Sequence, residues 1–128
     1  MSFHLGKRSL GRLKDVHPDL IQVVHRAIEI TMIDFTVLEG MRTIARQKKL
    51  VKAGASRTMN SRHLTGHAVD LAAYVDRRIA WDWPLYHQIA IDVKKAAVYV
   101  GVPIEWGGDW KTFKDGPHWQ LPWKEYPK

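Results

Sequence analysis

The sequence of 128 residues contains no cysteine. Disulfide bonds, thiolate zinc sites and a cysteine nucleophile are therefore excluded. No apolar run approaches the ~20 residues that a membrane-spanning helix needs. The first residues are polar and basic and lack the apolar segment of a signal peptide, so we expect synthesis in the cytoplasm. Four common active-site signatures are also missing: H-E-x-x-H, G-x-S-x-G, the P-loop and G-x-G-x-x-G.

Positive charge is present in excess. Lys and Arg number 20 against 13 Asp and Glu, which gives a formal net charge of +7. Such a surface favours anionic partners, namely nucleic acid, anionic lipid or an acidic cell-wall polymer. Charge alone does not choose among them, and a basic surface that only keeps the protein soluble is equally compatible. The length favours one domain over residues 1–128.

Hydrophobic periodicity predicts helices and strands that are interspersed without regular βαβ alternation, which favours an α+β fold. The first 17 residues are expected to form an arm or a short helix on the core. The expected helices begin at Pro18, Thr43 and Asp82, and the expected strands cover 34–39, 68–74, 102–106 and 118–121. In the second helix we expect Ile44, Leu50 and Val51 to face inward and the basic residues to face solvent.

The stretch 61–70, Ser-Arg-His-Leu-Thr-Gly-His-Ala-Val-Asp, contains the most informative carboxylate. Asp70 is flanked by apolar residues, and a carboxylate is rarely buried unless it is paired or bound to a metal. We therefore expect a metal ion at Asp70, with His63 as a second ligand. His67 is a rival that could bind the metal, contact substrate or face solvent, and spacing alone cannot rank the two histidines.

A hydrolytic zinc site usually has three protein ligands and one water, and His118 is a candidate for the third ligand. Asp115 precedes it by three residues, and the Gly-Pro turn between them can fold the carboxylate over the metal. Asp115 is therefore our candidate for the general base, with Asp109 as a competitor that could instead hold a loop. Arg42 could stabilise a developing oxyanion or form a structural salt bridge.

The combined pattern resembles the M15 metallopeptidases. Its parts are Ser61-x-His63-x-x-Gly66-x-Ala68-x-Asp70 and the distant Asp115-x-x-His118. It is most similar to phage endolysins that are L-alanyl-D-glutamate peptidases, and more distantly to D-Ala-D-Ala dipeptidases and carboxypeptidases. Further counterparts are Met1-Ser2-Phe3 with Gly6-Lys7 and Ser9, Asp34-Phe35-Thr36, Gly40-x-Arg42-Thr43 and Gly107-Gly108-Asp109-Trp110.

The resemblance implies one zinc ion held by His63, Asp70 and His118, a catalytic carboxylate at Asp115 and a substrate- and transition-state-binding arginine at Arg42. It also implies a small α+β domain of the hedgehog/DD-peptidase type, with an antiparallel sheet and packed helices. The expected activity is hydrolysis of the L-Ala–D-Glu bond in peptidoglycan stem peptides. The expected setting is phage-induced lysis, in which a holin releases the enzyme from the host cytoplasm to the periplasm and cell wall.

Two alternatives stay open. One is a D-Ala-D-Ala dipeptidase or carboxypeptidase of the same fold, and the other is a non-catalytic basic module that binds wall polymer, lipid or nucleic acid. We expect a monomer without a specific nucleic-acid partner. Some of the endolysins carry a longer acidic loop linked to calcium. Here the segment 110–118 is short and basic, so no calcium dependence is expected. Trp119 could wall the cleft or fill the core.

Overall fold

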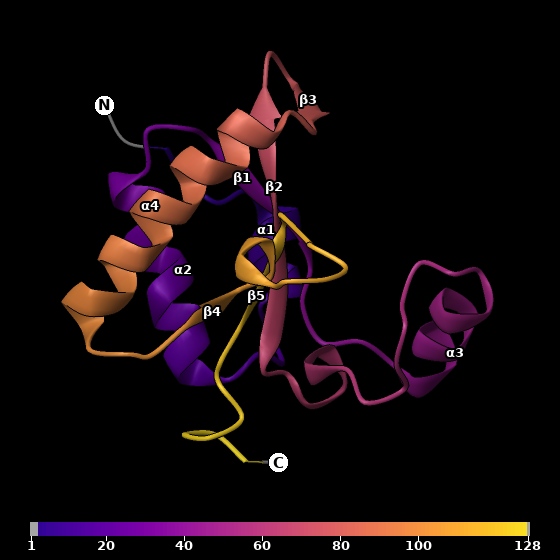
Figure 1. Ribbon diagram of the computed structural model, residues 1–128. Helices are drawn as coiled ribbons and strands as arrows, with labels where there is room; N and C mark the ends of the chain where they lie inside the picture. The colour runs from indigo at the N-terminus through magenta and orange to yellow at the C-terminus, as the bar shows by residue number, and fades with distance from the viewer. Residues whose placement is uncertain (1–2, 128) are drawn as a thin grey trace.

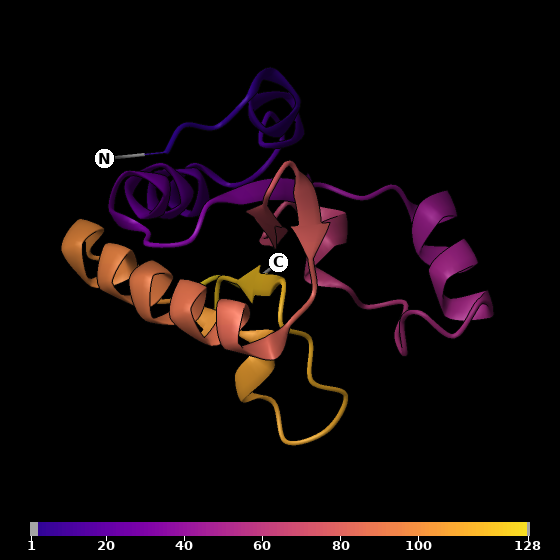
Figure 2. The same ribbon diagram turned by 90° about the horizontal axis from the view of Figure 1, so that it is seen from above.

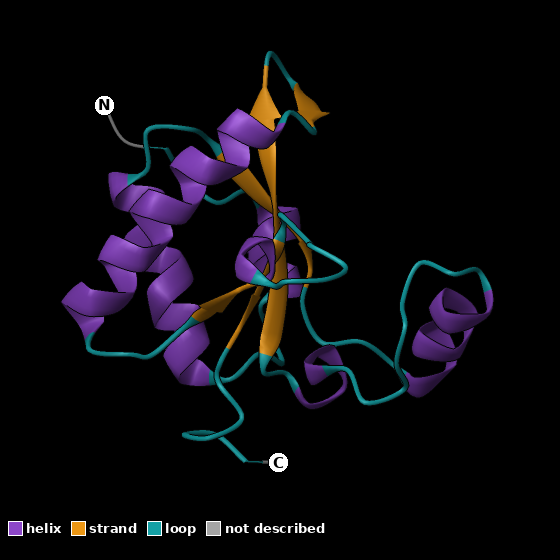
Figure 3. Ribbon diagram, viewed as in Figure 1, coloured by secondary structure: helices purple, strands orange, loops and turns teal. Residues whose placement is uncertain are grey.

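The computed structural model describes residues 3–127, so the matching Met1-Ser2 lies outside the described residues. It shows the expected small α+β fold with an antiparallel sheet and packed helices (Figure 1, Figure 3). The helices are α1 (Lys7–Arg12), α2 (Pro18–Ile30), α3 (Ile44–Lys52) and α4 (Trp83–Val100), with 3₁₀ turns η1 (Arg62–Thr65) and η2 (Gly107–Asp109). The strands are β1 (Phe35–Glu39), β2 (Ala68–Val75), β3 (Arg78–Ala80), β4 (Glu105–Trp106) and β5 (His118–Gln120).

The central strand of the sheet is β2. The strand order is β1-β2-β5-β4, with β3 also paired to β2, and every pairing is antiparallel. In this register Asp70 of β2 lies opposite Glu39 of β1 on one side and opposite His118 of β5 on the other. Residues opposite each other on neighbouring strands share a face of the sheet. The register therefore brings together side chains that lie far apart in the sequence.

Helices α2 and α4 pack side by side on one side of the sheet (Figure 1, Figure 2). Pro18 occupies the first turn of α2, and the imidazole of His17 caps this helix by accepting from the Asp19 amide. Gly101, at a φ of 75°, ends α4 as the sequence predicts. The core between these helices and the sheet holds Leu20, Val23, Val24, Ala27, Val37, Leu71, Ile89, Val93 and Ala96.

Helix α3 lies apart from this core and projects from the opposite side of the molecule (Figure 1, Figure 2). Thr43 caps it, as expected, by accepting from the Arg46 amide. The expected inward face is wrong for Ile44, which is 62% exposed, while Leu50 and Val51 are half-buried. Periodicity predicted an apolar stripe, but among the described residues the hydrophobic core includes none from α3. Gln47 is the buried residue of this helix.

Two further expectations change. The strand expected over 102–106 shortens to Glu105–Trp106, and the strand β3 was not foreseen. A hairpin turn joins β2 to β3 through Asp76 and Arg77, with φ values of 52° and 66°. Such turns usually carry Asn or Gly, so the sequence signal was weak.

Trp119 is 1% exposed and stacks on Trp106, so it belongs to the core. Within residues 3–127, no helix has the length and apolarity required to cross a membrane.

Candidate active site

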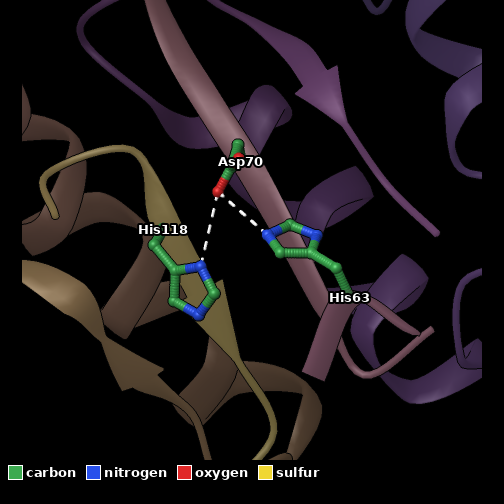
Figure 4. A group of neighbouring side chains, drawn as sticks. All are labelled: His63, Asp70 and His118. Carbon is green, nitrogen blue, oxygen red and sulfur yellow. Dashed lines mark hydrogen bonds and ion pairs between the residues drawn. The ribbon is translucent and has the colours of Figure 1, made fainter. Parts of the chain in front are cut away.

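Three side chains from three separate elements converge on one point (Figure 4). His63 comes from η1, Asp70 from β2 and His118 from β5. Oδ1 of Asp70 lies 3.2 Å from Nε2 of His63 and 3.4 Å from Nδ1 of His118. Metal–ligand bonds of about 2.0–2.1 Å in a tetrahedral zinc site place neighbouring ligand atoms about 3.3 Å apart. The observed spacing therefore fits a metal ion of this kind.

The remaining nitrogen of each imidazole is held by a hydrogen bond. Nδ1 of His63 donates to the Gly40 carbonyl at 2.8 Å, and Nε2 of His118 donates to Oε1 of Gln120 at 2.7 Å. In a neutral imidazole, these bonds leave a lone pair on the nitrogen that faces Asp70. Such outer hydrogen bonds are typical of metal-binding histidines because they fix the ring and its tautomer. Two lone pairs and a carboxylate oxygen thus point at one position, which suits a cation.

The electrostatics of the half-buried Asp70 carboxylate favour a positive charge at this position. Burial opposes the ionisation of Asp70, but its hydrogen bonds and electrostatic attraction to His118 and His63 outweigh this effect and hold the pKa of Asp70 well below its usual range. For His118, burial favours the neutral ring, yet the hydrogen bond and charge of Asp70 raise its pKa. Asp70 is therefore ionised at neutral pH, and its negative charge favours a cation at the point where the three side chains converge.

Two glycines allow the ligands to approach. A Cβ at Gly40 would collide with the Arg12 carbonyl oxygen, so only glycine lets this backbone reach His63. A Cβ at Gly107 would collide with the Asp115 carbonyl oxygen and stand 3.0 Å from Cβ of His118. Both glycines therefore serve close packing around the three convergent side chains.

A cleft of about 610 Å³ opens above the three side chains. Asp115 and Arg42 line it together with His63, Asp70 and His118. Burial, followed by the negative charge of Asp70, raises the pKa of Asp115, while the charges of His118, His63 and Arg42 act in the opposite direction. The five residues singled out from the sequence thus surround one cavity, and a carboxyl group of raised pKa suits proton transfer near neutral pH.

Comparison with known proteins identifies the family. The sequence model described as phage L-alanyl-D-glutamate peptidase matches residues 1–120. The chain belongs to this peptidase family. It is 34% identical over 119 residues to the L-alanyl-D-glutamate peptidase of Escherichia phage T5, covering 90% of this chain and 87% of the phage protein. The resemblance inferred from the sequence is therefore confirmed.

A further phage relative and two bacterial relatives are also named as L-alanyl-D-glutamate peptidases. The L-alanyl-D-glutamate peptidase of Listeria phage A118 is 37% identical over 94 residues, which are 73% of this chain but 32% of that protein. The peptidoglycan L-alanyl-D-glutamate endopeptidase CwlK of Bacillus subtilis is 32% identical over 125 residues, which cover 84% of this chain and 74% of CwlK. The crystal structure of the L-Ala D-Glu endopeptidase ChiX of Serratia marcescens superposes with a TM-score of 0.92 at 48% identity, covering 98% of this chain and 95% of ChiX.

In this peptidase-family chain Arg42 is held firmly at the edge of the cleft. It is buried, forms an ion pair with Glu39 and lies 3.7 Å from Oδ2 of Asp70. Its Nη1 donates to Oε1 of Gln47 at 2.7 Å. Gln47 is fully buried and also donates to the Thr58 carbonyl at 2.6 Å. Sequence reasoning missed Glu39 and Gln47 because a single polar residue in a predicted strand or helix carries no motif.

The two rivals considered from the sequence lie elsewhere. Neither His67 nor Asp109 is among the described residues that line the cleft. Nδ1 of His67 shares a hydrogen bond of 2.6 Å with the Thr65 hydroxyl, and its ring stands beside His17. Asp109 is exposed and forms an ion pair of 2.7 Å with Lys94. The structure therefore favours His63 over His67, and Asp115 over Asp109, as members of this site.

Arg62 has a structural function that the sequence did not reveal. It is 2% exposed, and its guanidinium donates to the carbonyls of Leu121 and Tyr126. The same group lies 4.1 Å from the centre of the Trp123 ring. Arg62 therefore fastens the C-terminal segment against η1, directly beside the ligand His63.

Proposed function

We propose that this chain hydrolyses the L-Ala–D-Glu bond of peptidoglycan stem peptides with one zinc ion held by His63, Asp70 and His118. The convergence of two oriented imidazole nitrogens on one carboxylate oxygen carries the proposal. Two imidazoles with one carboxylate are a ligand set of catalytic zinc sites that keep a fourth position for water or substrate. The family membership supports the choice of scissile bond.

A zinc ion bound here would lower the pKa of a water molecule and polarise the scissile carbonyl. The side chains of the cleft perform the remaining steps. Asp115 accepts a proton from the attacking water and delivers it to the D-Glu amine as the C–N bond breaks. Arg42, oriented by Glu39 and Gln47, donates to the carbonyl oxygen as negative charge develops there. These roles suit the raised pKa of Asp115 and the permanent charge of Arg42.

The biological setting is part of the same proposal. The substrate partner is bacterial peptidoglycan, and the net charge of +7 favours electrostatic contact with anionic wall polymers or membranes. Residues 1–128 act as one catalytic domain and as a monomer, without a specific nucleic-acid partner and without calcium. The phage origin of two relatives supports a lysis enzyme that reaches the wall from the host cytoplasm through a holin.

The deciding experiment identifies the cleaved bond. Purified peptidoglycan is incubated with the zinc-loaded protein, and new amino and carboxyl termini are labelled and identified by mass spectrometry. We expect a free D-Glu amino terminus. Release of D-Ala or of the D-Ala-D-Ala dipeptide would favour the carboxypeptidase or dipeptidase alternative, and binding without new termini would favour the non-catalytic module. Undiminished hydrolysis after removal of zinc by a chelator would contradict the metal mechanism.

A further inference from the structure

A second hollow adjoins the catalytic cleft on the other side of Asp115. It has a volume of about 240 Å³ and is lined by Trp81, Trp83, Tyr86 and residues 114–117. Asp115 lines both this hollow and the cleft. A Cβ added at Gly116 would stand 3.3 Å from the Trp83 ring and 3.4 Å from the Tyr86 ring. The loop that carries Asp115 therefore rests on aromatic rings and separates the two cavities.

The two indole rings of this hollow are exposed, and the buried Tyr86 ring supports them. Trp81 is 59% exposed and its ring is nearly parallel to that of Tyr86, at 7° and a centroid distance of 6.2 Å. Tyr86 is buried, and its hydroxyl donates to the Ala80 carbonyl and accepts from the Ala73 amide. Trp83 is 44% exposed, and its ring lies in a T-shaped arrangement with that of Trp106, at a centroid distance of 6.5 Å. The hollow thus presents two indole rings to solvent on a base that cannot easily collapse.

The chemistry of the substrate places a sugar close to the reacting bond. In a stem peptide, the lactyl group of N-acetylmuramic acid acylates the amino group of L-Ala. The sugar ring is therefore only about two residue lengths, ~7 Å, from the scissile carbonyl. A glycan attached to the peptide therefore lies within reach of protein surfaces immediately next to the cleft. Sugar rings have apolar C–H faces that pack on flat aromatic side chains, whose large apolar area and fixed geometry suit such contacts.

We infer that Trp81 and Trp83 form a sugar subsite that binds the N-acetylated amino sugar to which the cleaved stem peptide is attached. The inference rests on the proposed function, because it assumes that the stem peptide occupies the cleft. It assigns a substrate preference to this chain: stem peptides still joined to the glycan strand are cut faster than free peptides.

The kinetic test compares two substrates of the zinc-loaded protein. One is a muropeptide that carries N-acetylmuramic acid, and the other is the same peptide with an N-acetyl group in place of the sugar. Trp81→Ala should lower kcat/KM for the muropeptide about tenfold, which corresponds to about 1.4 kcal/mol, and leave kcat/KM for the free peptide unchanged. Trp81→Phe should retain most of the preference, because it keeps an aromatic ring. Tyr99→Ala is the matched control, since Tyr99 is an exposed aromatic residue (71%) at the far end of α4.

A binding measurement separates this inference from the proposed function. Peptide-free glycan fragments are titrated against the zinc-loaded protein while the indole N–H resonances are followed by NMR. Shifts centred on Trp81 and Trp83 would support the subsite even if neither substrate were cleaved. The absence of cleavage would refute only the proposed function. The inference would be overturned by shifts centred on Trp110 or Trp123 of the main cleft. It would also be overturned if Trp81→Ala lowered kcat/KM equally for both substrates, or if the wild-type protein cleaved both substrates at the same rate.

Discussion

Replacement of Asp115 by Asn is the sharpest test of how the cleft works. Asn keeps the size of the side chain but cannot accept the proton of the attacking water. The hydrogen bonds that shape this loop use the main chain: the Asp115 amide donates to the Gly107 carbonyl at 3.0 Å, and the Asp115 carbonyl accepts from the His118 amide at 3.2 Å. Asp115→Asn should therefore fold normally and keep the three proposed ligands in place.

The expected loss follows from the role of the carboxylate. General acid–base catalysis contributes about 10²–10⁴-fold to a rate. At about 1.36 kcal/mol per tenfold, this is about 3–5 kcal/mol of the activation barrier. The binding of zinc should not change, because His63, Asp70 and His118 are untouched. By contrast, His118→Ala should lose both zinc and activity, since it removes one of the three convergent side chains.

The assay measures kcat on purified peptidoglycan and the zinc content of the same samples. Asp109→Asn is the matched control, because Asp109 is an exposed carboxylate with a surface ion pair to Lys94, and its turnover should be that of the wild type. Near-normal turnover of Asp115→Asn would refute the assignment of the base. Loss of activity only in proportion to lost zinc would show instead that Asp115 serves the metal site.

Three further predictions concern stability and positioning. Gln47→Leu removes the acceptor of a buried Arg42 donor, so the free energy of unfolding measured in urea should fall by about 1–3 kcal/mol. The kcat should also fall at unchanged zinc content, and an unaltered kcat would exclude a positioning role for Gln47. Zinc at a thousand times its Kd should raise the free energy of unfolding by about 4 kcal/mol. Calcium should change neither the thermal midpoint nor the activity, and a calcium requirement would contradict the prediction made from the short basic loop. Burial, followed by the charges of Arg62 and His17, lowers the pKa of His67 below 6.5. Its contribution to stability is therefore present above pH 6.5 and is lost as the pH falls through the folded-state pKa. The His67→Gln variant should lose less stability on acidification than the wild type, and identical profiles of stability against pH would refute this.

Local sequence was sufficient for the fold class and for the candidate residues. Helices α2, α3 and α4 begin at, or one residue after, the expected Pro18, Thr43 and Asp82. Their positions follow from local signals such as the proline at the start of α2, the Thr43 cap and apolar spacing, which act within a few residues of each other. An ionisable residue among apolar neighbours, as at Asp70, identifies itself because burying a charge without a partner is costly. The family resemblance likewise rests on short patterns of residue types.

The tertiary structure decided what the spacing left open. It placed His63, and not His67, beside Asp70, and it placed Asp115, and not Asp109, in the cleft. It also left Ile44 exposed on a projecting helix whose pattern predicted burial.

The physical reason is the same in each case. Helical periods and caps depend on neighbours in the chain, so the sequence by itself determined the three longer helices and the chemistry available. The extent of the short strands β3 and β4, and which side chains meet, depend instead on strand register and on packing between distant segments. The pairing of Asp70 with both Glu39 and His118 across the sheet is such a contact. The hold of Gln47 on Arg42 likewise exists only once the chain has folded.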